Sequence, residues 1–211
     1  MTMTGLSATD LSSLDTQVLY LFAMVSEGLA AATAAFLSGD KDCARSLSAN
    51  DHHVDELQLE IENLVFRELT EERTLTRGEL AHLLLVMQIV PELERSGDLV
   101  EHIALRTPQD LARAISPRCR SLIEDMGRIA VEMWRLAATA FRERDPTAAD
   151  RLRVRDDEID DLHVTLTAEL ATVSLPVPVA IEMGLVARFF ERLGDHAVNV
   201  SRRLALSTPA R

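Results

Sequence analysis

The sequence predicts an all-α protein made of two tandem three-helix bundles, with six long helices in total. Its composition favours helix, because the 211 residues are rich in Ala, Leu, Glu and Arg while only 4% are aromatic and 8 are glycine. Helix start signals recur along the chain, and its two halves repeat each other at fixed offsets. The chain is long enough to bury a sizeable core in one domain or in two.

The first bundle is predicted to span residues 13–107, after a flexible N-terminal tail at residues 1–12. Residues 18–37 are mostly apolar and nearly long enough to span a membrane. However, Glu27 lies in the middle of this stretch, and no Lys or Arg precedes Lys41, so the basic start of a signal peptide is missing. We therefore expect the first helix to be the buried helix of a soluble protein.

Capping residues mark the next two helices. Asp40 is placed to cap a second helix that runs to about Thr70. Thr76 and Glu79 form a capping box for a third helix, which is expected to end near Arg106.

The second bundle is predicted to span residues 108–207, and prolines mark the starts of its helices. Proline is favoured in the first turn of a helix, where its missing N–H has no intrahelical partner to lose. The marked starts are Thr107-Pro108, Ser116-Pro117, Asp145-Pro146 and the stretch that contains Pro176 and Pro178.

The two halves align as an internal repeat. An offset of 105 residues relates the second helices of the two halves, pairing Asp51, Val54 and Asp55 with Asp156, Ile159 and Asp160. An offset of 97 residues relates the third helices, pairing Glu94, Arg95, Gly97 and Asp98 with Glu191, Arg192, Gly194 and Asp195. Two equivalent three-helix units in tandem are therefore expected.

Four pairs of carboxylates stand at matching positions of this repeat. The members of each pair are four residues apart, so a helix holds them on one face, where their repulsion calls for a counter-charge. If the two acidic helices of a unit lie side by side, four carboxylates converge, and such hard oxygen ligands suit Mg, Mn, Ca or iron. The candidate metal ligands are Asp51, Asp55, Glu94, Asp98, Asp156, Asp160, Glu191 and Asp195.

Helical angles place these carboxylates beside or opposite the apolar stripes, where solvent should reach them. The predicted stripes are Val54, Leu57, Ile61 and Leu64 in the second helix and Leu185, Phe189, Leu193 and Val200 in the sixth. His102 and Asn199, one turn beyond Asp98 and Asp195, are candidates for additional ligands or for hydrogen-bond partners of ligands. His196, which follows Asp195, is expected at the surface.

The charge balance and the cysteines exclude several classes of function. A formal charge of −12 argues against binding to nucleic acid, which needs clustered Lys and Arg. Cys43 and Cys119 lack metal-ligand or redox spacing, which favours a reducing compartment without disulfides. No nucleophile–base pair or phosphate-binding glycine loop accompanies the carboxylates, so no catalytic residues are expected.

The run Glu-Arg-Leu-Gly-Asp-His-Ala-Val-Asn at residues 191–199 resembles the signature of the PhoU family, and residues 94–104 resemble its first-repeat copy. The resemblance extends over residues 14–206. It implies a cytoplasmic and commonly dimeric protein that binds divalent or trivalent metal ions (Mg, Mn, Fe or Zn). It also implies a negative regulator of phosphate-starvation signalling that contacts a phosphate ABC transporter and a sensor histidine kinase at the inner face of the membrane. The first copy departs from the family pattern, because Glu101-His102 stands where Val-Asn is usual.

Three alternatives stay open. One is a PhoU-like accessory protein of a low-affinity phosphate permease. Another is a ferritin-like di-metal enzyme, for which Glu79 and His82 supply a single Glu-x-x-His motif. The third is a structural adaptor whose carboxylates are solvated and bind no metal.

Overall fold

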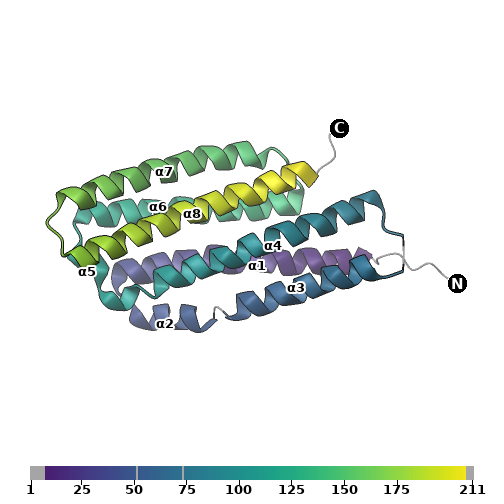
Figure 1. The fold of residues 1–211 in the computed structure, drawn as a ribbon, viewed down its shortest axis with the longest axis horizontal. Coiled ribbons are helices and arrows are strands. Elements are labelled where there is room, and N and C mark those ends of the chain that lie inside the picture. The colour runs from purple at the N-terminus through teal and green to yellow at the C-terminus, as the bar shows by residue number, and fades with distance from the viewer. Residues whose placement is uncertain (1–7, 51, 73, 208–211) are drawn as a thin grey trace.

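The computed structural model describes residues 8–50, 52–72 and 74–207, and within these ranges the chain is helical and contains no strand. The long helices lie roughly parallel to one another along the length of the molecule (Figure 1). The predicted all-α class is therefore confirmed.

The first half contains α1 (Ala8–Ser38), α2 (Lys41–Asn50), α3 (His52–Thr70) and α4 (Arg77–Ala104). α1 begins inside the segment that was expected to be a tail, of which residues 1–7 lie outside the described part of the chain. The helix expected from Asp40 to Thr70 corresponds to α2 and α3, which lie on either side of residue 51. The predicted ligand Asp51 lies outside the described residues.

The caps predicted for this half are confirmed. The Asp40 carboxylate accepts hydrogen bonds from the backbone N–H groups of Asp42 and Cys43, at 3.1 and 3.0 Å. At the start of α4, Thr76 N–H donates to the Glu79 carboxylate at 2.7 Å and Glu79 N–H donates to the Thr76 hydroxyl at 3.2 Å. These bonds satisfy N–H groups that the first helical turn leaves without partners.

A short connection joins the halves through η1 (Thr107–Gln109) and α5 (Leu111–Ala114). The predicted boundary between residues 107 and 108 falls within η1. The prediction that Thr107 caps a helix was wrong: Arg106 precedes the short 3₁₀ turn without a side-chain capping bond, and Thr107 itself is buried. Proline in the first turn is equally suited to a 3₁₀ turn, so the dipeptide alone does not predict a long helix.

The second half contains α6 (Pro117–Glu143), α7 (Ala148–Thr172) and α8 (Val177–Ser207). Ser116 caps α6 as predicted, since its hydroxyl accepts a hydrogen bond from Cys119 N–H at 3.1 Å. Asp145 instead bonds both the N–H and the hydroxyl of Thr147, which directly precedes α7.

The two halves share one hydrophobic core. α1 packs against α4 and α6, and α8 packs against α4, α6 and α7, while α3 covers α4. Phe22 of α1 meets Trp134 and Phe141 of α6, with ring centroids 6.1 and 5.8 Å apart. Because these aromatic side chains come from both halves, neither half would keep its core intact alone.

α1 is the one helix within the described ranges that is long and apolar enough to cross a membrane by length and composition, over Leu11–Ser38. Half of its most apolar window is buried inside the protein, and Val18, Leu21, Phe22 and Val25 are fully covered. The apolar side chains of α1 are thus covered in large part by the other helices of this protein.

α4 and α8 run antiparallel along a polar seam between the halves. Arg106, which follows the end of α4, pairs with Glu182 of α8 at 2.8 Å, and the Arg203 guanidinium donates to the Glu92 carboxylate at 2.9 Å. Between them the Ser96 hydroxyl lies 3.0 Å from His196 Nδ1, and both side chains are buried. The expectation that His196 lies at the surface was wrong, because the seam covers it.

Gly127 of α6 packs closely against Thr33 of α1. A Cβ at this position would lie 2.5 Å from Cγ2 of Thr33, whose stiff β-branched side chain is buried. We expect Gly127→Ala to lower the free energy of unfolding by about 1–2 kcal/mol, since overpacking outweighs the gain in helix propensity. Urea denaturation measures this.

Gly184 of α8 is the matched control, because a Cβ there would meet no atom within 4 Å. Gly184→Ala should raise the free energy of unfolding by about 0.5–1 kcal/mol. Equal shifts in the two variants would contradict the proposed close contact, whereas restoration of stability by adding Thr33→Ala to Gly127→Ala would support it.

Candidate functional site

The first carboxylate cluster lies between α3 and α4. Asp55, Glu94 and Asp98 each bring one carboxylate oxygen within 4.8 Å of the others. Oxygens bound to one ion at about 2.1–2.5 Å lie at most about 5 Å apart, so these three side chains could hold a shared ion. Burial raises the pKa of Asp98, and the negative charges of Asp55 and Glu101 add to this rise. His102 opposes it.

The second cluster lies between α7 and α8 and has the stronger electrostatic signature. Burial, followed by the charges of Asp195, Asp160 and Glu191, raises the pKa of Asp156 to about 7. Burial also raises the pKa of Asp160, to which Asp195 adds. The pKa of Glu191 is raised chiefly by burial, although the neighbouring Arg188 opposes this. Four negative groups therefore act on one another across two helices.

Two oxygens of this cluster are buried without a hydrogen-bond partner. Within the described part of the chain, Oδ1 of Asp156 and Oε2 of Glu191 make no hydrogen bond. Buried carboxylate oxygens normally have donors or bind a cation, because desolvation without compensation is costly. The chemistry of this donor set fits a cation with hard oxygen ligands, which Asp156, Asp160, Glu191 and Asp195 would hold. Of the two clusters, however, only the first brings three oxygens within 4.8 Å of one another, so the second would have to draw its oxygens closer together to share one ion.

The two motif glycines allow the neighbouring acidic helix to pack closely, α3 against Gly97 and α7 against Gly194. A Cβ on Gly97 would lie 3.2 Å from Val54, and a Cβ on Gly194 would lie 2.5 Å from Oδ1 of Asp156. Gly194 thus leaves the space into which the Asp156 carboxylate points, while Gly97 leaves room for an apolar side chain.

The carboxylates are less exposed than the helical angles predicted. Asp55, Asp160 and Asp195 are exposed, but Glu94, Asp98, Asp156 and Glu191 are half-buried. The predicted stripe of the sixth helix was wrong at Leu185, which is 38% exposed. α8 packs on three helices, so its buried arc is too wide for a single stripe and takes in Met183, Val186, Phe190 and Leu193.

The candidate additional residues differ between the halves. His102 is exposed and its ring lies 5.5 Å from that of Phe189, whereas Asn199 is half-buried. The sequence did not point to His163 of α7. Its charge opposes part of the rise in the pKa values of Asp160 and Glu191. Its position three residues after Asp160, on the same helix face, is the signal that could have found it.

The Glu-x-x-His motif does not form a metal pair. Glu79 belongs to the capping box of α4, and the Nε2 atom of the buried His82 lies 2.7 Å from Oδ1 of Asp15. Both residues therefore have structural partners away from the carboxylate clusters, which removes the basis for a ferritin-like centre.

Comparison with known proteins agrees with this architecture. The model of the PhoU domain matches residues 18–107 and 123–204. The phosphate-specific transport system accessory protein PhoU homolog 1 of Mycobacterium tuberculosis is 33% identical over 176 residues, which cover 82% of this chain and 79% of the relative. The PhoU accessory protein of Escherichia coli is 27% identical over 195 residues, covering 90% of this chain and 80% of that protein.

A solved structure supports the same fold. The crystal structure of PhoU from Pseudomonas aeruginosa superposes with a TM-score of 0.86 at 23% identity, covering 94% of this chain and 97% of that one. The domain match and the similarity to the mycobacterial relative extend over most of the sequence, on both repeats. The chain belongs to the PhoU family.

Proposed function

We propose that this protein is an accessory protein of a phosphate-specific transport system that binds metal ions at its carboxylate clusters. It acts as a negative regulator of phosphate-starvation signalling, through contact with the phosphate transporter and a sensor histidine kinase at the cytoplasmic face of the membrane. Family membership and the names of the relatives support the transport role. We also propose that two copies of this chain form a homodimer.

The observation that carries the metal role is the buried, unpaired oxygen of Asp156 among three further carboxylates. A bound divalent ion, Mg, Mn, Fe or Zn, supplies positive charge that offsets their repulsion. The residues of this chain position the oxygens on α7 and α8 and keep Asp156 against Gly194. A protein whose cluster binds metal would present a less negative and more rigid surface to its partners.

Metal content of the purified protein tests this proposal. Elemental analysis after loading and desalting should find metal in the wild type and much less in a Glu191→Ala, Asp195→Ala variant. Asp161→Ala, which removes an exposed carboxylate from α7, is the matched control and should retain metal. Equal metal content in all three proteins, or none in any, would contradict a functional cluster and favour the adaptor.

Phosphate-starvation repression tests the regulatory role. Deletion of the gene should derepress a phosphate-starvation reporter at high phosphate, and the wild-type gene should restore repression. The double variant should restore it poorly, while Asp161→Ala should restore it fully. Normal repression in the deletion strain, with no second copy of the gene, would rule out this role and favour service to another phosphate permease.

A further inference from the structure

A cavity of about 610 Å³ opens at the end of the molecule where α4 begins and where α6 and α8 end. It is remote from the cores of both carboxylate clusters, and the proposed metal role does not use it. Its volume is within the range of sites that bind ligands or side-chain groups. Leu85, Phe141 and Leu204 give it apolar walls.

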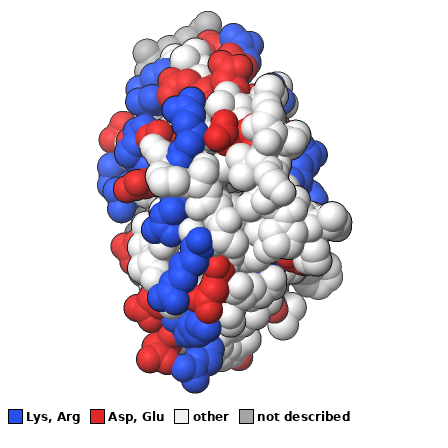
Figure 2. All heavy atoms as spheres, turned by 90° about the vertical axis from the view of Figure 1, so that its left-hand side faces the viewer, with Lys and Arg blue, Asp and Glu red and all other residues white. Residues whose placement is uncertain are grey.

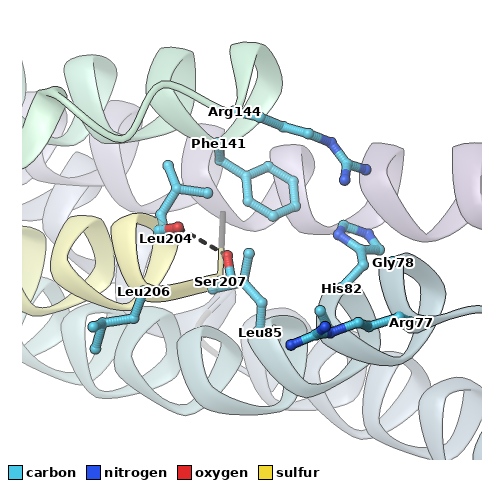
Figure 3. Close-up of a pocket in the computed structure, with 10 residues that line it drawn as sticks. Arg77, Gly78, His82, Leu85, Phe141, Arg144, Leu204, Leu206 and Ser207 are labelled. Atoms are coloured by element: carbon cyan, nitrogen blue, oxygen red, sulfur yellow. Dashed lines mark hydrogen bonds between the residues drawn. The ribbon is translucent and has the colours of Figure 1, made fainter. Parts of the chain in front are cut away.

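Two arginines give this cavity a positive rim. Arg77 and Arg144 extend from opposite sides, with His82 and Phe141 between them (Figure 3). Arg77 forms no ion pair within the described part of the chain, and Arg144 reaches only Asp15, at 3.9 Å. Oδ1 of Asp15 already lies 2.7 Å from His82. A cationic rim is notable in a chain of formal charge −12.

The start of α4 adds to this positive potential. Arg77 and Gly78 occupy the first turn, and a Cβ on Gly78 would meet no atom within 4 Å, so the chain at Gly78 faces open space. Helix N-termini favour anions through their unpaired N–H groups. The Glu79 carboxylate in the same turn is bonded to the backbone of Thr76.

The internal repeat shows what fills the equivalent place at the other end. The offsets of 105 and 97 residues relate Phe141 to Phe36, Arg144 to Gly39 and Leu204 to Thr107. At that end the connection between the halves lies over the end of α1 and the start of α8. Its side chains Leu111, Ala112 and Ile115 are only 4, 3 and 7% exposed.

This connecting segment also brings a negative charge. Asp110 pairs with Lys41 at 3.0 Å and lies beside Gly39, the equivalent of Arg144. The Arg120 guanidinium donates to the carbonyls of Ala112 and Leu37, at 2.7 Å each, which ties the segment to α1. Figure 2 views this covered end, where Lys and Arg atoms form a band beside a largely uncharged area.

We propose that the open cavity binds a peptide segment of a partner protein, in which an acidic residue precedes apolar residues on one helical turn. The acidic group meets Arg77 and Arg144, and the apolar side chains cover Leu85, Phe141 and Leu204. The chain itself places a segment of this chemistry, Asp110 to Ile115, at the equivalent position of the other half. Within residues 8–50, 52–72 and 74–207, the cavity has no cover equivalent to the one at the other end.

A fluorescently labelled peptide with the sequence of residues 107–116 is the probe, measured by fluorescence anisotropy against the full-length protein. We expect saturable binding of one peptide per chain.

Arg144→Gly and Arg77→Ala should each weaken peptide binding by about tenfold, the usual effect of losing one charge-assisted contact. Both arginines are exposed, so these variants should fold; glycine also suits the left-handed backbone of Arg144, at φ 53°. Arg142→Ala, which removes an exposed arginine from the last turn of α6, two residues before Arg144, is the matched control and should leave binding unchanged.

Two further arms test the chemistry. A peptide with asparagine in place of Asp110 should bind about tenfold more weakly, and Ala81→Trp, which fills the cavity, should abolish binding. Absence of saturable binding, equal binding to all arginine variants, or binding of dodecanoate but not of the peptide would overturn the proposal. Binding that appears only after removal of residues 208–211 would assign the cavity to the chain's own C-terminus and would likewise overturn it.

Discussion

Asp156→Asn is expected to stabilise the metal-free protein at pH 8 and to remove its stabilisation by metal. The folded protein holds this carboxyl at a pKa of about 7, against an ordinary value of 3.8. Below about pH 4 the group is protonated in both the folded and the unfolded chain, so it costs no stability there. Between about pH 4 and 7 the unfolded chain releases this proton while the folded protein keeps it among three other carboxylates, so stability falls over that range and stays low above pH 7. Asparagine does not ionise and keeps that stability.

Solvent screening at this half-buried group limits the gain at pH 8 to about 1–2 kcal/mol, or a rise in melting temperature of about 2–8 °C. Thermal unfolding in chelator at pH 4 and pH 8 measures it, and the two proteins should converge at pH 4. With Mn²⁺ added, the wild type should gain stability while the variant binds the ion about 10–100-fold more weakly. Destabilisation of the metal-free variant at pH 8 would contradict the electrostatic account of the cluster.

Arg203→Met is expected to destabilise the protein by about 2–4 kcal/mol, because it leaves Glu92 buried with weaker compensation. Glu92 is 5% exposed, and Arg203 donates to its carboxylate at 2.9 Å and to the backbone carbonyl of Gln88 at 2.8 Å. Arg95 stays 3.7 Å from Glu92 and limits the loss. Urea denaturation measures the free energy of unfolding.

The neighbouring Arg202→Met is the matched control, since Arg202 is exposed and should tolerate the change within about 0.5 kcal/mol. Adding Glu92→Leu to Arg203→Met should recover much of the lost stability, because the uncompensated charge is then gone. A double variant as unstable as the sum of the two single variants would show that the side chains do not interact.

The features that could be predicted from sequence are those set by local chemistry. The caps at Asp40, Thr76 and Ser116 depend on residues within three positions, and the structure confirms each of them. The all-α class follows from composition and from the repeat, and family membership follows from the two glycine-containing acidic motifs.

Contacts between distant positions could not be read in the same way. His196 is buried because it meets Ser96, a hundred residues earlier, across a seam that no local pattern marks. The stripe assigned to the last helix erred at Leu185 because one helix faces three neighbours. The connection that follows Arg106 folds as a 3₁₀ turn and one short helix, since burial of Leu111 and Ile115 decides its course.

The polar seam between α4 and α8, together with the common core, holds the two halves in a fixed relative orientation. Ion pairs at both ends of the seam and the buried Ser96–His196 contact at its middle oppose rotation of one half against the other. An ion that binds to the carboxylate clusters of such a rigid protein would change the electric field at the surface without changing the arrangement of the helices. A partner would then distinguish loaded from unloaded protein by long-range attraction, so their association should depend steeply on ionic strength.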